Sequence, residues 1–115
     1  MSLRESRLSK NNALNWRCVV KAFVIVQETI HDQTIFDAYR KEVMATIVEF
    51  GGQFIVRGGK LTVVEGEWPF QRTIILEFPS RVDAEAWYAS PAYQKVLPLR
   101  LKSCTCNLVI VDGPA

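Results

Sequence analysis

Few side chains in this sequence are suited to acid–base chemistry. His31 is the one histidine, and imidazole is the side chain that exchanges protons most readily near neutral pH, so a general base is one interpretation of it. It precedes a predicted helix, where a solvated neighbour of the helix cap is the alternative. Tyr39 falls on the apolar stripe of that helix, where a buried hydroxyl needs a partner and can donate a hydrogen bond to a ligand oxygen. His31 and Tyr39 are therefore the candidate catalytic residues.

Two opposite charges end otherwise apolar strands. Arg57 ends a predicted strand at 53–57, and Glu77 lies near the end of another at 72–78. If these strands are neighbours, the two ions can pair across the sheet. One interpretation is a buried ion pair that fixes strand register or a dimer contact. The other is a ligand site, in which the carboxylate orients an arginine toward an acidic or carbonyl-bearing small molecule.

Aromatic side chains form a second candidate set, because they offer a flat apolar wall and, in Tyr and Trp, a polar tip. Trp87 is either a residue of the core or dimer contact, or the wall of a pocket. We take Trp87 and Tyr93, with Arg57 and Glu77, as the candidate ligand-binding residues. The whole set comprises Tyr39, Trp68, Phe70, Trp87, Tyr88 and Tyr93.

Three cysteines, an odd number without an export signal, predict reduced thiols. With His31, the cysteines Cys18, Cys104 and Cys106 could supply three sulfurs and one nitrogen as metal ligands. Paired C-x-x-C knuckles are missing, so we predict no metal and take these residues as ordinary cysteines, with Cys104 and Cys106 at the entrance of a strand. The sequence has no glycine-rich loop with the lysine that would bind phosphates, and no G-x-S-x-G motif that would indicate a serine hydrolase. We expect no bound cofactor and retain a small-molecule pocket of mixed polarity.

Composition indicates one globular domain. The chain has 115 residues, of which 49% are hydrophobic and 23% charged, as in ordinary folded proteins. The formal charge is +2, but residues 1–17 carry +3 and leave −1 on residues 18–115. We therefore predict a flexible basic leader over 1–17, a single domain over 18–115, and no nucleic-acid partner. Apolar runs are too short to span a bilayer and no signal-peptide pattern is present, so we predict a cytoplasmic protein without a membrane partner.

Hydrophobic periodicity predicts the order of the elements. A β-branched run starting near residue 18 predicts a central strand, and an apolar stripe from 35 to 50 predicts a helix that Asp32 or Thr34 caps. Short strands follow at 53–57, 61–65 and 72–78, the first two joined by a glycine turn. Ser80 then caps a helix that restarts at Ser90, with Pro98 limiting its length, and 108–111 is the last strand. The order predicts an α+β, ferredoxin-like βαββαβ sandwich with an antiparallel sheet.

Both helices of such a sandwich cover the same face of the sheet. The strands nevertheless carry apolar residues on both parities: Phe23 and Ile25 alternate with Val24 and Val26. A bare apolar sheet marks an association surface, and a two-fold dimer packed sheet on sheet is its simplest closed arrangement. We therefore predict a homodimer.

Four motifs in order resemble the domain of unknown function 1330 family over about residues 20–113. They are Phe50-Gly-Gly-Gln-Phe-Ile-Val-Arg-Gly-Gly59, Val64-Glu-Gly-Glu-Trp68, Arg72-Thr-Ile-Ile-Leu-Glu-Phe-Pro-Ser80 and Ala86-Trp-Tyr-Ala-Ser-Pro-Ala-Tyr-Gln94. The resemblance implies a dimeric α+β barrel, whose relatives include cofactor-free monooxygenases. It implies a small-molecule-binding protein that acts as a cofactor-independent enzyme on a carbonyl or phenolic metabolite, by proton transfer or oxygenation. A non-catalytic dimeric metabolite-binding or accessory protein is the alternative.

Overall fold

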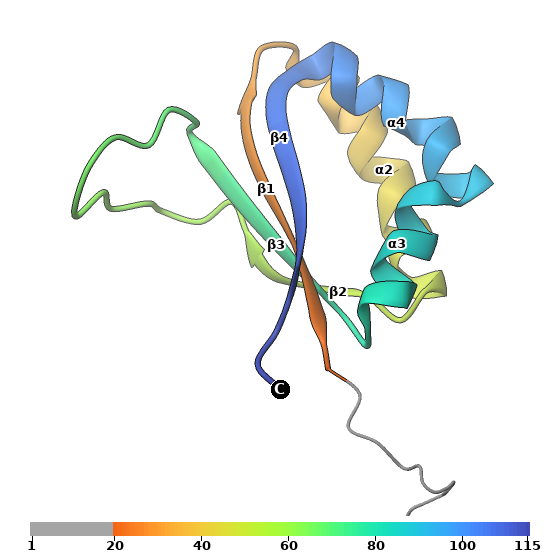
Figure 1. The fold of residues 1–115 in the computed structure, drawn as a ribbon. Helices are drawn as coiled ribbons and strands as arrows, with labels where there is room; N and C mark the ends of the chain where they lie inside the picture. Colours follow the sequence, from red (N-terminus) through yellow and green to blue (C-terminus); the bar gives the residue numbers. More distant parts are fainter. Residues whose placement is uncertain (1–19) are drawn as a thin grey trace, which may run out of the picture.

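The computed structural model describes residues 20–115, so the predicted leader over 1–17 and Cys18 lie outside the described residues. Within residues 20–115, seven elements follow one another (Figure 1). They are β1 (Ala22–Ile30), α2 (Gln33–Glu49), β2 (Gln53–Arg57), β3 (Arg72–Phe78), α3 (Arg81–Ala89), α4 (Pro91–Ser103) and β4 (Cys104–Asp112).

The four strands form one antiparallel sheet in the order β2-β3-β1-β4. β1 is an inner strand, as its β-branched run predicts, and all three helices lie on one side of the sheet (Figure 1). This arrangement confirms the predicted α+β ferredoxin-like sandwich.

Residues at the helix ends start and stop the helices. Asp32 accepts a hydrogen bond from the backbone N–H of Ile35 at 3.1 Å and begins α2. Gly51, at a φ of +80°, follows the last turn of α2, where a left-handed conformation suits glycine. Ser80 caps α3 and Ser90 caps α4 through their side-chain oxygens.

Pro98 does not limit α4, contrary to the sequence prediction. The helix continues through it to Ser103, and β4 begins at Cys104, four residues before the predicted start of the last strand. A proline within a helix costs about 3 kcal/mol. Burial of side chains on both sides of it, among them Leu97 and Arg100, offsets that cost.

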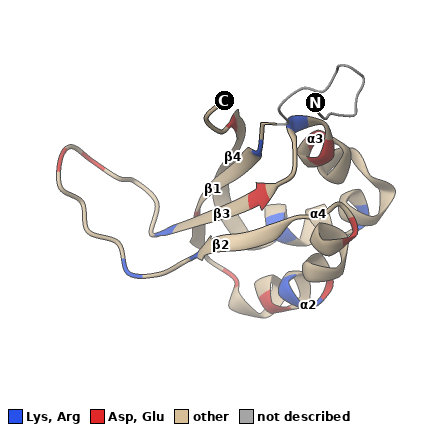
Figure 2. Cartoon of the chain, turned by 90° about the horizontal axis from the view of Figure 1, so that it is seen from below, with Lys and Arg blue, Asp and Glu red and all other residues tan. Residues whose placement is uncertain are grey.

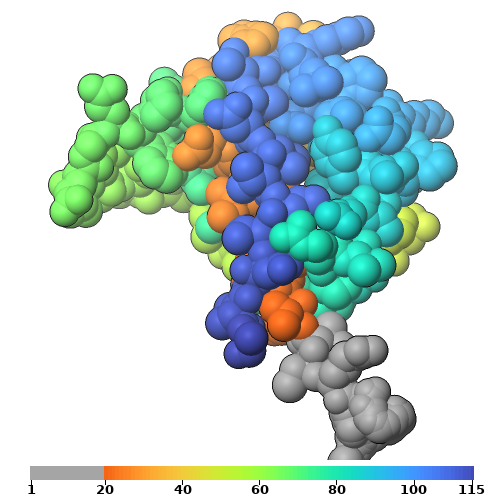
Figure 3. Space-filling view, viewed as in Figure 1, coloured from red at the N-terminus to blue at the C-terminus, as the bar shows by residue number. Residues whose placement is uncertain are grey.

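The predicted strand at 61–65 is absent. Residues 58–71 form a long loop between β2 and β3, and β2 pairs with β3 instead of with this segment. The loop stands away from the body of the molecule, on the opposite side from the helices (Figure 3). Val64 is 86% exposed, so its β propensity gains nothing from burial within this chain.

The core fills the space between the sheet and the helices. Side chains of alternate parity in β1 and β3 meet the inner faces of α2, α3 and α4. The largest fully buried side chains are Trp87, Tyr93, Phe78, Ile47 and Val24. The other parity forms an open sheet face, on which Val109 is 55% and Val111 42% exposed, as predicted for an uncovered apolar surface.

Candidate functional site

The strand register separates Arg57 from Glu77, so the predicted ion pair is wrong. β2 and β3 are neighbours, but they run antiparallel, which sets Glu77 opposite Gln53 and Arg57 opposite Ile74. Glu77 instead accepts from Gln53 at 3.1 Å and pairs with Lys21 at 3.3 Å.

A bulge gives Arg57 a different position from the one its parity predicts. Between Phe54 and Val56 the register shifts by one residue, so Arg57 lies opposite the buried, helix-facing Ile74. The guanidinium carbon of Arg57 lies 4.2 Å from the centre of the Phe54 ring. Arg57 therefore belongs to the side of the sheet that the helices cover.

A cavity of about 60 Å³ lies between the sheet and the helices. A single water needs roughly 10–15 Å³ of such space, so the cavity admits several waters or part of a small molecule. Its wall is mostly apolar, with four arginines, two tyrosines and one glutamate added. The lining residues are Val26, Glu28, Phe36, Tyr39, Arg40, Val43, Ile47, Phe54, Arg57, Arg72, Ile74, Leu76, Trp87, Tyr93, Arg100 and Leu108.

A hydrogen-bonded series of buried side chains lies at this cavity. The hydroxyls of Tyr39 and Tyr93 are 3.0 Å apart, and Arg100 donates from Nε to the Tyr93 hydroxyl at 3.2 Å. A second nitrogen of Arg100, Nη1, lies 2.9 Å from the sulfur of Cys106. Tyr39 thus has the partner that its predicted burial demands.

Burial and the neighbouring groups set the protonation states of the side chains in this hydrogen-bonded series. Burial raises the pKa of Tyr39 and of Tyr93, so both hydroxyls stay neutral. Burial alone would lower the pKa of Arg100, but Tyr93, Cys106 and Tyr39 outweigh it and raise that pKa. A fixed cation with neutral hydroxyl donors is suited to hold a ligand oxygen that carries or gains negative charge.

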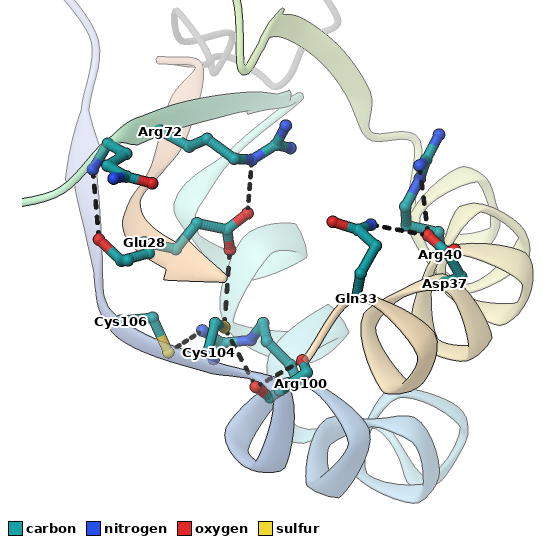
Figure 4. Close-up of polar contacts among 11 residues, drawn as sticks. Glu28, Gln33, Asp37, Arg40, Arg72, Arg100, Cys104 and Cys106 are labelled. Carbon is teal, nitrogen blue, oxygen red and sulfur yellow. Dashed lines mark hydrogen bonds and ion pairs between the residues drawn. The ribbon is translucent and has the colours of Figure 1, made fainter. Parts of the chain in front are cut away.

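A buried ion pair forms another part of the cavity wall. Glu28 is 2% exposed, and its Oε2 accepts from Nε of Arg72 at 3.0 Å (Figure 4). Gly58, at a φ of +74°, makes room for this arginine, because a Cβ there would lie 2.5 Å from its guanidinium. The carboxylate therefore has a fixed direction beside the cavity.

Cys104 and Cys106 lie on β4, near this pair (Figure 4). The Cys104 sulfur is 3.9 Å from Glu28 Oε1 and 3.1 Å from the backbone oxygen of Arg100. Burial, with smaller contributions from Cys106 and Glu28, raises the pKa of Cys104 to about 12. Within residues 20–115 no group of three or more His, Cys, Asp or Glu side chains is placed to hold a metal ion.

The structure brings together four of the six predicted site residues. Tyr39, Arg57, Trp87 and Tyr93 line the cavity, and Trp87 is also a core residue whose Nε1 donates to Thr46 at 3.0 Å. His31 is exposed in the turn before α2, and Glu77 lies among the residues of the open sheet face; neither lines the cavity. Trp68, from the predicted aromatic set, lies in the loop over 58–71 and donates to Thr73 at 3.3 Å.

Glu28, Arg72 and Arg100 are site residues that sequence reasoning missed. Glu28 shares its parity with Val24 and Val26, so strand alternation places it on the buried face. Arg100 lies two helical turns after Tyr93, but the sequence prediction that Pro98 limits the helix leaves Arg100 off its buried face. No local signal marks Arg72, since its partner is 44 residues away.

The fold and the cavity define an α+β protein of the ferredoxin-like class with a small cavity between sheet and helices. The chain belongs to the family described as a domain of unknown function (DUF1330), which matches residues 21–114 and confirms the resemblance of its motifs. No functionally curated protein matches the chain.

Solved structures share the fold at low sequence identity. A protein of unknown function from Rhodopseudomonas palustris is 13% identical, with a TM-score of 0.69 over 92% of this chain and 91% of that one. SnoaB, a cofactor-independent oxygenase from Streptomyces nogalater, is 12% identical, with a TM-score of 0.56 over 84% and 96%. A dimeric ferredoxin-like protein of unknown function from Jannaschia sp. CCS1 is 19% identical, with a TM-score of 0.55 over 83% and 99%. Within residues 20–115, no helix has the length and apolar character needed to cross a membrane.

Proposed function

We propose that this protein binds a small organic molecule in the cavity between its sheet and helices. The observation that carries the proposal is the hydrogen-bonded series Tyr39–Tyr93–Arg100, which brings two hydroxyls and a cation to a mostly apolar cavity wall. Buried polar groups of this kind cost stability unless they are satisfied, and they fix the orientation of a ligand that carries oxygen. A carbonyl or phenolic compound fits this wall.

The same wall supports cofactor-independent chemistry. Glu28 is the one carboxylate among the cavity-lining residues of the described chain, and Arg72 directs it. It is suited to accept a proton from a carbon next to a carbonyl, or from a phenol. One hydroxyl proton of the Tyr39–Tyr93 pair is used between the two oxygens, so the other can donate to the ligand oxygen that gains charge. Glu28 therefore takes the role of base that the sequence suggested for the exposed His31. SnoaB, which has this fold, is described as a cofactor-independent oxygenase, which supports oxygenation as the further step.

A non-catalytic metabolite-binding protein is the second candidate. The ion pair with Arg72 gives the Glu28 carboxylate a structural role that needs no reaction. This favours a cavity that binds a ligand without catalysis. A thermal-shift screen with small carbonyl and phenolic compounds, followed by mass-spectrometric analysis of each hit for product, separates the two candidates. Turnover that Glu28→Gln abolishes, with binding retained, supports catalysis. Binding without product supports the passive candidate, and no stabilisation by any compound contradicts both.

The open sheet face supports a homodimer. Phe23, Ile25 and Ile75 lie at paired register positions on this face, next to the exposed Val109 and Val111. Such a face is covered most simply by a second copy related by a two-fold axis. The neighbour from Jannaschia, described as dimeric, has the same fold.

Light scattering at micromolar concentration tests the dimer, which has about twice the chain mass of 13.1 kDa. Val109→Glu places a charge on the open face and is expected to give a folded monomer. Val82→Glu is the matched control, because Val82 is 74% exposed on α3, away from that face. A parent protein that is monomeric, or a Val109→Glu variant that stays dimeric, contradicts sheet-on-sheet pairing.

A further inference from the structure

Two of the four arginines that line the cavity have firm polar partners, and the two at its rim do not. Arg72 contacts Glu28 at 3.0 Å, and Arg100 contacts Tyr93 and Cys106. Among residues 20–115, no carboxylate lies within ion-pair distance of Arg57, whose described contact is with the Phe54 ring.

Arg40 is only loosely paired. Its Nη1 lies 3.6 Å from Oδ1 of Asp37, one turn earlier on α2, and both side chains are more than half exposed. The same oxygen also accepts from Gln33 at 2.9 Å (Figure 4). An exposed ion pair of this kind contributes at most about 1 kcal/mol, so a ligand can replace it.

These two arginines lie where the apolar cavity meets the surface. Both line the cavity, and both also line an adjoining surface depression of about 420 Å³, together with Asp37 and Lys41. The depression thus has three basic side chains and one acidic side chain, and Figure 2 shows that α2 presents both signs on its surface. The site has an apolar interior and a net positive entrance.

We propose that the ligand of the cavity is an organic acid whose carboxylate binds between Arg40 and Arg57 and whose apolar body enters the cavity. This inference rests on the proposed small-molecule site and names the class of its ligand. Arginine is suited to the role, because its planar guanidinium donates two parallel hydrogen bonds to a carboxylate. The bulge in β2 turns Arg57 to this side of the sheet, and contact with Phe54 limits its motion.

Matched acids and methyl esters test this assignment. Calorimetric titration uses benzoate, 4-hydroxyphenylacetate and hexanoate, each beside its neutral methyl ester. The parent protein is expected to bind at least one acid about tenfold or more tightly than its ester, because a charge-assisted hydrogen bond contributes that much. Raising the salt concentration from about 50 to about 300 mM should weaken binding of the acid and leave the ester unchanged.

Variants at the rim then locate the carboxylate. Arg57→Met and Arg40→Met are each expected to remove most of the preference for the acid and to keep the affinity for the ester. Both side chains are exposed, so both variants should fold, which circular dichroism checks. Lys102→Met is the control, because it removes one positive charge from an exposed position on α4 that does not line the cavity.

Two results would overturn the assignment and leave the cavity as a ligand site. One is an ester that binds as tightly as its acid throughout the panel. The other is a preference for the acid that survives both rim substitutions. If neither acids nor esters bind, the small-molecule site itself is wrong, together with this assignment.

Discussion

Removing Arg72 is expected to destabilise the protein more than removing its partner Glu28. The Glu28 side chain is 3% exposed, whereas that of Arg72 is 32% exposed. Arg72→Met therefore leaves an almost fully buried carboxylate without its cation, while Glu28→Leu leaves a cation that can turn toward solvent. Because the two side chains are unequally buried, the two substitutions should lower the free energy of unfolding by unequal amounts, and this difference tests the buried pair directly.

The expected magnitudes follow from this asymmetry. Breaking a buried pair on one side typically costs about 3–5 kcal/mol, and we expect Arg72→Met near 3 kcal/mol, because the pair is partly reached by solvent. Glu28→Leu should cost about 1.5–2 kcal/mol, the lower part of the range for one lost hydrogen bond to a charged group. The double variant should lie within about 1 kcal/mol of the parent, since apolar replacement of both members is often close to neutral.

Urea unfolding followed by circular dichroism measures all three variants at one fixed protein concentration, so that association contributes equally. With a urea dependence of about 1–3 kcal/mol per molar, Arg72→Met should lower the midpoint by about 1–3 M. An additive double variant, or a Glu28→Leu variant less stable than Arg72→Met, would refute the reasoning.

Three further outcomes are expected. Tyr93→Phe should cost about 2–3 kcal/mol in urea unfolding and Tyr39→Phe only about 1 kcal/mol. Tyr93 is the middle member of the hydrogen-bonded series, so its loss removes the partner of the Tyr39 hydroxyl and the acceptor of Arg100 Nε together. Equal costs would contradict this order. Since burial raises the pKa of Tyr39 and Tyr93, the stability they contribute is complete below about pH 10 and is lost as the pH rises above it. Ultraviolet titration should show that two of the three tyrosines ionise only as the chain unfolds. In a Cys18→Ser background at about pH 8, a disulfide reagent should label the partly exposed Cys106. Cys104 should stay unlabelled until the protein unfolds, because burial raises the pKa of its thiol to about 12. Prompt labelling of both thiols would show that Cys104 is accessible.

Local patterns in the sequence determined most of the fold. The caps at Asp32, Ser80 and Ser90 act within three residues, so they are visible in the chain itself. The β-branched run of β1 and the two-sided apolar strands likewise predicted an inner strand and an open sheet face. Tyr39 was predictable as a site residue because helical spacing alone places it on the buried stripe.

Two segments could not be predicted from local patterns of this kind. Residues 61–65 have the composition of a strand but no neighbouring strand to pair with, and they form a loop. Pro98 stops an isolated helix, yet in α4 the packing of the residues around it stabilises the helix beyond that point. In both cases contacts distant in sequence outweighed a local propensity.

Tertiary structure alone decided which charges face one another. Antiparallel pairing separates Arg57 from Glu77, and the bulge after Phe54 turns Arg57 toward the helices. Glu28 meets Arg72 across the sheet at a separation of 44 residues. Electrostatic pairing depends on distances of a few ångströms, and one residue of register reverses the face of a strand to which a side chain points. The sequence therefore supplied the charged residues of the site, while the sheet register determined their partners.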